Sequence, residues 1–104
     1  MTKIVPEFND VIHSPMRLRI CGLLRTVDEL EFAVVRDTLD ITDAHLSKNL
    51  KLLADAGMVA LRKERSSGRS DARRLTWIAL TASGRRAVES HLAALRQIAE
   101  GVTL

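Results

Sequence analysis

Apolar residues in the first part of the chain recur every three or four residues, the spacing of helices that bury one face. Ser14 and Pro15 form a typical helix start, because a hydroxyl can cap the first turn and proline fits its first position. A second helix is predicted within residues 29–39, where acidic side chains at the amino-terminal end suit the helix dipole. The apolar faces of these helices consist of Leu18, Cys21 and Leu24, and of Phe32, Val35 and Leu39.

Residues 42–57 predict a third helix, which follows a link of only two residues. Thr42 is its capping residue, Asp43 suits the dipole in the first turn, and Gly57 favours the left-handed conformation that ends a helix. One face is apolar and consists of Leu46, Leu50 and Leu53, with Asn49 nearer to this side. The opposite side carries Ala44, Lys48 and Lys51, with His45 and Ser47 on its flanks.

The spacing changes after residue 57. Residues 58–65 and 73–80 are rich in β-forming side chains, and the turn-forming sequence SSGRSDA lies between them. Together they predict a β-hairpin with a basic tip, after which Thr81 caps a final helix.

Two helices joined by a tight turn form a helix-turn-helix, and a hairpin after such a unit makes a winged helix. The predicted fold class is therefore mostly α with a β-hairpin wing: a three-helix core, the wing and a carboxyl-terminal helix. We expect a single domain over residues 1–104, with the helix-turn-helix and wing in 13–81 and the last helix in 82–104.

The net charge is only +3, but the charges are unevenly distributed. Residues 28–44 contain six acidic side chains against one basic, whereas residues 45–74 contain eight basic against three acidic. A basic zone confined to one stretch is typical of a nucleic-acid-binding surface. Charge alone favours this interpretation no more than it favours a solvated face with scattered charge.

The third helix, residues 42–57, is expected to lie in the major groove of DNA, and the wing, residues 65–74, on the backbone or the adjacent minor groove. The predicted contacts are Thr42, Ala44, His45, Ser47, Lys48 and Lys51 in the helix, and Arg65, Arg69, Arg73 and Arg74 in the wing. Specificity would come from the helix, and affinity mainly from counterions released by the basic wing. The alternative for the helix is an ordinary amphipathic surface helix.

Two families of transcriptional regulators resemble parts of this chain. The opening helix of ArsR-type repressors is similar to HSPMRLRICGLL (residues 13–24), and their recognition helix to LSKNLKLLADAGMV (residues 46–59). The wing of MarR-type regulators and of small one-domain winged-helix proteins is similar to DARRLTWIALTASGRRAV (residues 71–88). The resemblance covers residues 13–95 and implies a DNA-binding regulator, with Ser47 and Lys48 on the DNA-reading helix and Asp71 and Arg73 in the wing.

This chain departs from the ArsR pattern in two ways. It contains one cysteine, so the metal-sensing cysteine pair of ArsR repressors is absent and a soft-metal sensor of that design is excluded. Asn49 stands where the ArsR helix usually has histidine.

The last helix carries an apolar stripe with spacings of four, three, four and three residues, the period of a coiled-coil seam. This stripe predicts a homodimer interface made of Val88, Leu92, Leu95, Ala99 and Val102. The alternative is that the stripe packs on its own domain.

The sequence offers no chemistry beyond binding. Cys21 lies on an apolar face and is interpreted as a core residue rather than a redox sensor. The three histidines fall on different elements without metal-ligand spacing, so no metal is expected. No nucleophile with a base, carboxylate pair or phosphate loop is recognisable, so we expect neither an enzyme nor a cofactor.

Two further expectations concern surroundings and ligands. Because no segment has the apolar length of a signal peptide or membrane span, we expect a cytoplasmic protein without membrane contact. Trp77 shares a strand face with Leu75 and Ala79 and is expected to pack between wing and helices. A ligand pocket beside it is the alternative, which leaves a small-molecule effector open.

The predicted function is that of a sequence-specific, double-stranded-DNA-binding transcriptional regulator acting as a homodimer. The alternative is a winged-helix module that binds proteins or nucleic acids without sequence preference. Selection of a discrete half-site from random DNA separates the two.

Overall fold

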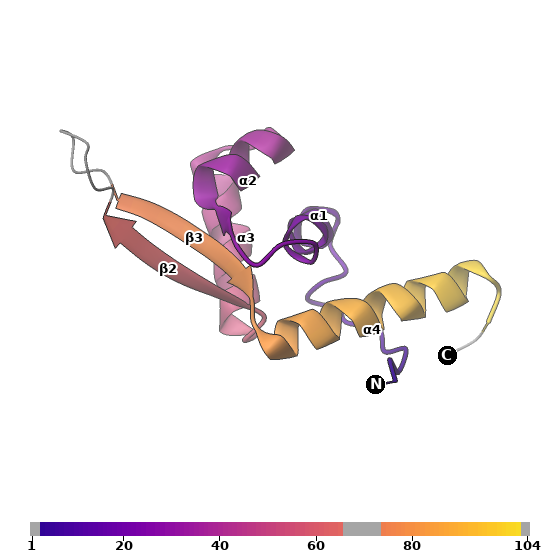
Figure 1. Cartoon of the computed structure of the whole chain (residues 1–104). Coiled ribbons are helices and arrows are strands. Elements are labelled where there is room, and N and C mark those ends of the chain that lie inside the picture. Colours follow the sequence, from indigo (N-terminus) through magenta and orange to yellow (C-terminus); the bar gives the residue numbers. More distant parts are fainter. Residues whose placement is uncertain (1–2, 66–73, 103–104) are drawn as a thin grey trace.

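The computed structural model describes residues 3–65 and 74–102, with only the backbone of Arg74, as four helices and a three-stranded antiparallel sheet. In chain order these are α1 (Pro15–Leu24), β1 (Leu30–Glu31), α2 (Phe32–Leu39), α3 (Asp43–Asp55), β2 (Val59–Arg65), β3 (Arg74–Leu80) and α4 (Ala82–Ala99). The β2–β3 hairpin projects from the helical body on one side, and α4 runs away from it on the other (Figure 1). The predicted fold class is confirmed. In the part of the chain that is described, no helix combines the length and apolar character needed to cross a membrane.

Helix α1 begins at the predicted residues, but its cap differs from the prediction. Ser14 is the N-cap residue and Pro15 the first helical residue, yet the Ser14 hydroxyl makes no capping hydrogen bond. The helix buries Ile20, Cys21 and Leu24 against α2, α3 and β3.

The predicted second helix starts later than expected. Leu30 and Glu31 form the short strand β1, which pairs with Ile78 and Trp77 of β3, so the sheet has a third strand that the sequence did not predict. This strand bonds to the free edge of β3, whose backbone groups would otherwise lack partners. As a result no acidic residue lies in the first turn of α2, contrary to the dipole argument.

A left-handed residue and an ion pair join α2 to α3. Asp40 has a φ of 54°, a conformation that aspartate tolerates better than most residues, and it ends α2. The Arg36 side chain donates from Nη1 to Asp43, the first residue of α3, at 2.8 Å. Thr42 caps α3 as predicted, because its hydroxyl oxygen accepts from the backbone N–H of His45 at 3.1 Å. Gly57, with a φ of 75°, follows the end of α3 as predicted.

The two long strands present one side to the helices, and their outer side is exposed on β2 and half-buried on β3. Val59, Leu61 and Lys63 pair with Leu80, Ile78 and Thr76 on the side that faces α3. Ala60, Arg62 and Glu64 pair with Ala79, Trp77 and Leu75 on the outer side. Trp77 therefore shares a face with Leu75 and Ala79, but this face is the outer one. The expectation that Trp77 packs between wing and helices is wrong, since Ile78 and Leu80 occupy the core instead.

A tight junction joins the end of α3 to the start of α4. Thr81 caps α4 by accepting from the Gly84 N–H at 2.9 Å, and its own hydroxyl donates to the Gly57 carbonyl at 2.6 Å. Gly84 is buried against the Met58 backbone, where a Cβ atom would overlap the Met58 carbonyl group. These contacts set the direction in which α4 leaves the body.

Only part of the predicted stripe on α4 is available for a partner. Val88 is 1% exposed and belongs to the core of its own domain, so it cannot lie in a free seam. Leu92 and Leu95 are half-buried, and Ala99 is exposed at the last helical position. Val102 lies beyond the helix, after Gly101, and is 48% exposed. The expected seam is thus shortened at both ends, because the domain core covers its start and the helix stops before its end.

Candidate nucleic-acid interface

One side of α3 is exposed and mostly polar, and Leu52 is its large apolar residue, at 43% exposure. Its predicted contact residues, Thr42, Ala44, His45, Ser47, Lys48 and Lys51, are all exposed, whereas Leu46, Leu50 and Leu53 are buried. Within the described residues Lys48 has no ion-pair partner, and Lys51 pairs with Asp55 at 3.1 Å on the open surface. Such an exposed pair is worth little in free energy, so Lys51 can exchange Asp55 for a phosphate.

A groove of about 340 Å³ runs between α3 and the wing. Ser47 and Lys51 line it from α3, and Lys63 and Thr76 line it from β2 and β3. The rest of its lining is apolar and consists of Phe32, Leu50, Ala54 and Leu61. Polar and basic groups of the helix and of the wing therefore belong to one continuous surface, which we call the α3–wing groove.

Sequence reasoning missed Lys63 and Thr76 as parts of this surface. The signal was present, because Val59 has to face the core and side chains alternate along a strand. Every second residue after Val59 shares its face of the strand, which puts Leu61, Lys63 and Arg65 on the side that faces α3.

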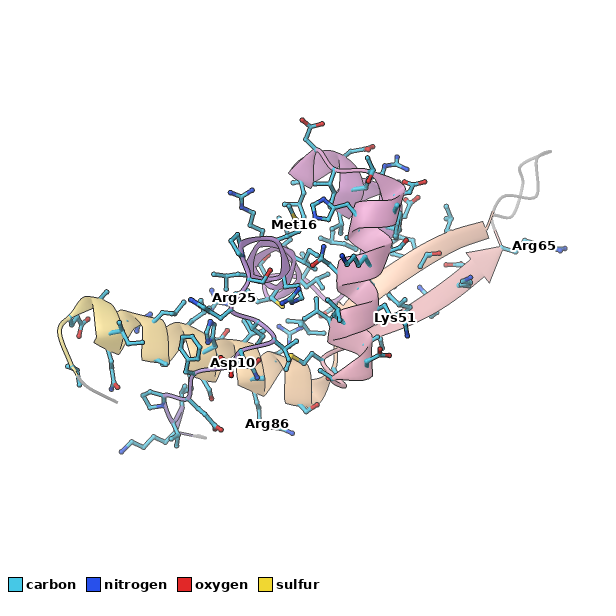
Figure 2. The ribbon with its side chains drawn as sticks, turned by 180° about the vertical axis from the view of Figure 1, so that it is seen from behind. Asp10, Met16, Arg25, Lys51, Arg65 and Arg86 are labelled. Carbon is cyan, nitrogen blue, oxygen red and sulfur yellow. The ribbon has the colours of Figure 1, made fainter. Side chains whose placement is uncertain are left out.

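The structure locates only some of the predicted wing residues. Arg65, at the end of β2, is exposed and lies far out along the hairpin from Lys51 of α3 (Figure 2). Arg74 pairs with Arg65 through the backbone of β3. Arg69 and Arg73, with Asp71, lie outside the described residues.

Not every basic residue of the 45–74 stretch faces the groove. Arg62 points to the outer side of the sheet, where it donates to Glu29 at 2.7 Å and to Glu64 at 3.2 Å. These two hydrogen bonds raise the pKa of the guanidinium. Its carbon also lies 5.7 Å from the centre of the Trp77 ring, a cation–π contact.

The acidic stretch before α3 is partly neutralised within the fold. Arg36 bonds Asp37 and Asp43, which raises the pKa of Arg36, and the bond from Arg36 lowers the pKa of Asp37. With Glu29 held by Arg62, these acidic groups present less negative charge near α3 than the sequence suggests.

The remaining candidates for chemistry are buried or incomplete. Cys21 is fully buried, and burial raises its pKa to about 11, so the thiol stays protonated at neutral pH. His13 and His91, predicted on separate elements, lie with ring centroids 5.3 Å apart beside Phe8. Within the described part of the chain, no three potential metal-ligating side chains gather.

A helix-turn-helix followed by a basic hairpin, with a long helix running back past the amino-terminal segment, defines a small winged-helix protein. A family model described as a winged helix DNA-binding domain matches residues 16–99, and the chain belongs to this family. An uncharacterized protein of Methanocaldococcus jannaschii is 28% identical over 92 residues, which cover 88% of this chain and 96% of the relative.

Solved structures share the fold. A transcriptional regulator homologue from Pyrococcus horikoshii superposes with a TM-score of 0.80 and 23% identity, over 90% of this chain and 89% of that one. The zinc-responsive MarR family member ZitR of Lactococcus lactis gives a TM-score of 0.61 at 17% identity, over 96% of this chain and 66% of that one. NadR, solved with 4-hydroxyphenylacetate, gives 0.66 at 24% identity, over 89% of this chain and 62% of that one. All three are less than 25% identical to this chain, and they show that it shares their fold.

Proposed function

We propose that this protein is a sequence-specific, double-stranded-DNA-binding transcriptional regulator that acts as a homodimer. The α3–wing groove is the observation that carries the proposal. The exposed face of helix α3 presents His45, Ser47, Lys48 and Lys51, with Ala44 and the 43%-exposed Leu52 among them. A major groove about 12 Å wide admits one such helix, and its phosphate rim would then meet Lys51 and Lys63.

The roles of helix and wing differ in this proposal. Ser47, Lys48 and His45 reach base edges or phosphates from the first half of α3, where a recognition helix enters the groove. The wing arginines contact the DNA backbone and the adjacent minor groove; they are Arg65, Arg69, Arg73 and Arg74. ZitR, which shares the fold, has also been solved in complex with DNA. This chain superposes on that structure with a TM-score of 0.58 at 18% identity. A function on DNA is also the reason to propose a cytoplasmic location.

The proposed dimer uses the second half of α4 together with the amino-terminal segment. A groove of about 570 Å³ there is lined by the apolar residues Ile4, Leu92, Ala93 and Leu95 and by the charged residues Arg25, Glu89 and Arg96. Ile4 and Ile98 are each 50% exposed, more than an isolated domain needs to leave in water. One recognition helix buries too little surface for a typical specific affinity, whereas two about 34 Å apart meet successive major grooves.

Selection from random duplex DNA tests this function. We expect the wild-type chain to enrich a pseudo-palindromic site, and Lys48→Ala to weaken binding to that site by roughly 1–3 kcal/mol if it contacts a base edge. Arg86→Ala is the matched control and should retain the affinity, because it removes an exposed cation of α4 that lies apart from Lys51 on the exposed side of α3 (Figure 2).

Two results would contradict the proposal. Equal, strongly salt-dependent affinity for every duplex favours a module without sequence preference, and no affinity for DNA favours a protein-binding module. A small-molecule effector stays an open prediction, and NadR is a protein of this fold that has been solved with one.

A further inference from the structure

Two polar side chains connect α1 to the buried side of α3. Arg17 donates from Nη1 to Oδ1 of Asn49 at 3.2 Å, and from Nε to the Val11 carbonyl at 2.6 Å. Asn49 is only 6% exposed, and its Nδ2 donates to the His45 carbonyl one turn earlier at 2.9 Å. Asn49 thus has partners for both ends of its amide, although it lies on the core side of the helix.

Packing energy does not explain an asparagine at this position. A leucine there would extend the stripe of Leu46, Leu50 and Leu53 and bury more apolar surface. Burial of an amide costs free energy that its hydrogen bonds roughly offset. What hydrogen bonds add is direction, because they weaken steeply when donor and acceptor move out of line, whereas apolar contacts tolerate small rotations.

Small rotations of α3 matter for reading bases. Side-chain atoms lie about 5 Å from a helix axis, so a rotation of about 10° moves them by about 1 Å. A base-edge hydrogen bond is lost over a shift of that size. The buried face of α3 therefore controls the contacts that its exposed face makes.

The other end of this connection is held by α4. Asn9 donates its backbone N–H to Nδ1 of His91 at 2.9 Å, and its Oδ1 accepts from the Ile12 N–H at 3.0 Å. The turn of residues 9–12 is thereby docked on α4 and presents the Val11 carbonyl to Arg17. Hydrogen bonds and short backbone links run from α4 through this turn and Arg17 to the core side of α3.

We infer that Arg17 and Asn49 are positioning residues, which fix the rotation of α3 relative to the 9–12 turn and α4. They touch no DNA. They hold the polar face of α3 at the angle at which Ser47 and Lys48 meet base edges. This angle is thereby fixed relative to α4, the helix of the proposed dimer. The inference rests on the proposed function.

The test compares the wild type with Arg17→Met/Asn49→Leu, Asn49→Leu and Arg17→Lys. For each protein we measure unfolding by denaturant, affinity for the selected site and for random duplex, and the dependence of both on salt. The double variant replaces a partly buried polar pair by apolar side chains, so we expect it to fold with equal or greater stability. Its affinity for random duplex and its salt slope should stay unchanged, because Lys48 and Lys63 remain. Its preference for the selected site should fall roughly tenfold, the size of one base contact.

Arg85→Met is the matched control. Arg85 also joins two elements by donating to backbone carbonyls, those of Arg25 at 2.9 Å and Val27 at 3.3 Å, but within the described residues it makes no hydrogen bond to α3. We expect it to keep the wild-type preference even though the loss of its two hydrogen bonds lowers the stability. Arg17→Lys keeps the charge but loses the forked geometry, and should lower the preference in a chain that folds even if the double variant does not.

Wild-type preference in the folded double variant, or in Arg17→Lys, overturns the positioning role. An equal loss of preference in Arg85→Met also overturns it, because the effect would then follow stability alone. A wild-type chain that selects no site overturns the proposed function and this inference with it.

Discussion

Gly84 of α4 lies against the backbone of Met58 with no room for a Cβ atom between them. Met58 directly follows Gly57, the glycine after the end of α3, so this contact fixes the start of α4 beside the end of α3. The Thr81 hydroxyl, bonded to both sides of the junction, holds the same arrangement. The relation between α3 and α4, the proposed DNA-reading helix and the proposed dimer helix, thus depends on a backbone-to-backbone contact.

Gly84→Ala should destabilise the protein by about 1–3 kcal/mol or more, because the added methyl group meets backbone atoms that cannot rotate away. Gly22→Ala is the control. Gly22 lies exposed in α1 with open space around it, and alanine there should stabilise the helix by about 0.5–1 kcal/mol. Denaturant unfolding measures both changes, and equal stability of Gly84→Ala and the wild type would refute the close contact.

Lys63→Ala should weaken binding to all DNA sequences and lower the slope of log affinity against log salt by about one, the effect of one lost phosphate contact. Lys63 faces the α3–wing groove, whereas its neighbour Arg62 faces the outer side and is held by Glu29 and Glu64. Arg62→Ala is therefore a control that removes a charge at the adjacent position of the same strand.

We expect the salt slope of Arg62→Ala to stay near that of the wild type. A unit change in both variants would show that the slope follows net charge rather than the groove. A changed base preference in Lys63→Ala, at constant slope, would make the wing a reader of sequence.

Most of the fold followed from spacing and caps. The leucine stripe, Thr42 and Gly57 determine α3 within two residues, because a capping side chain and a left-handed glycine mark helix ends by local chemistry. The strand β1 could not be predicted in this way, since Leu30 and Glu31 are strand residues only through their pairing with β3. Tertiary contact overrode local preference there.

The sequence indicates only part of the candidate site. The exposed side of α3 follows from the turn of about 100° per residue along a helix. The alternation of side chains along β2, counted from Val59, indicates that Lys63 faces the same groove. The partnerships of Arg17 with Asn49 and of Arg62 with Glu29 join residues more than 30 positions apart, and no local pattern encodes them.

Leu95→Glu/Ile98→Glu should convert the proposed dimer into a folded monomer, which sedimentation detects. Leu95 and Ile98 lie on the second half of α4, beyond the part that Val88, His91 and Ala94 bury in the domain core. Like charges facing each other across a desolvated seam are strongly unfavourable. Specific DNA binding should be lost and weak general binding kept.

Val34→Glu is the control for surface charge. Val34 is 46% exposed on α2, away from the proposed seam, and should leave the oligomeric state unchanged. If Leu95→Glu/Ile98→Glu stays dimeric, this end of α4 is not the interface.

The stability of the protein should depend on pH through His91. Its Nδ1 accepts a hydrogen bond from Asn9, and within the described residues its buried Nε2 has no partner, so the native fold holds the neutral ring. Burial lowers the pKa of His91, the neighbouring His13 lowers it further, and Asp10 acts in the opposite direction.

Between the lowered pKa of the folded state and the ordinary value of about 6.5, the unfolded chain binds more protons than the native one. The free energy of unfolding should therefore fall as the pH drops below about 6.5, and level off below the folded pKa.

His91→Asn keeps an acceptor near the position of Nδ1 but does not titrate, so its stability should lose most of this dependence. His13→Asn removes a like charge, raises the pKa of His91 and should reduce the dependence without abolishing it. Denaturant unfolding from about pH 5 to pH 8 measures all three proteins, and the same decline in His91→Asn as in the wild type would assign the effect to another group.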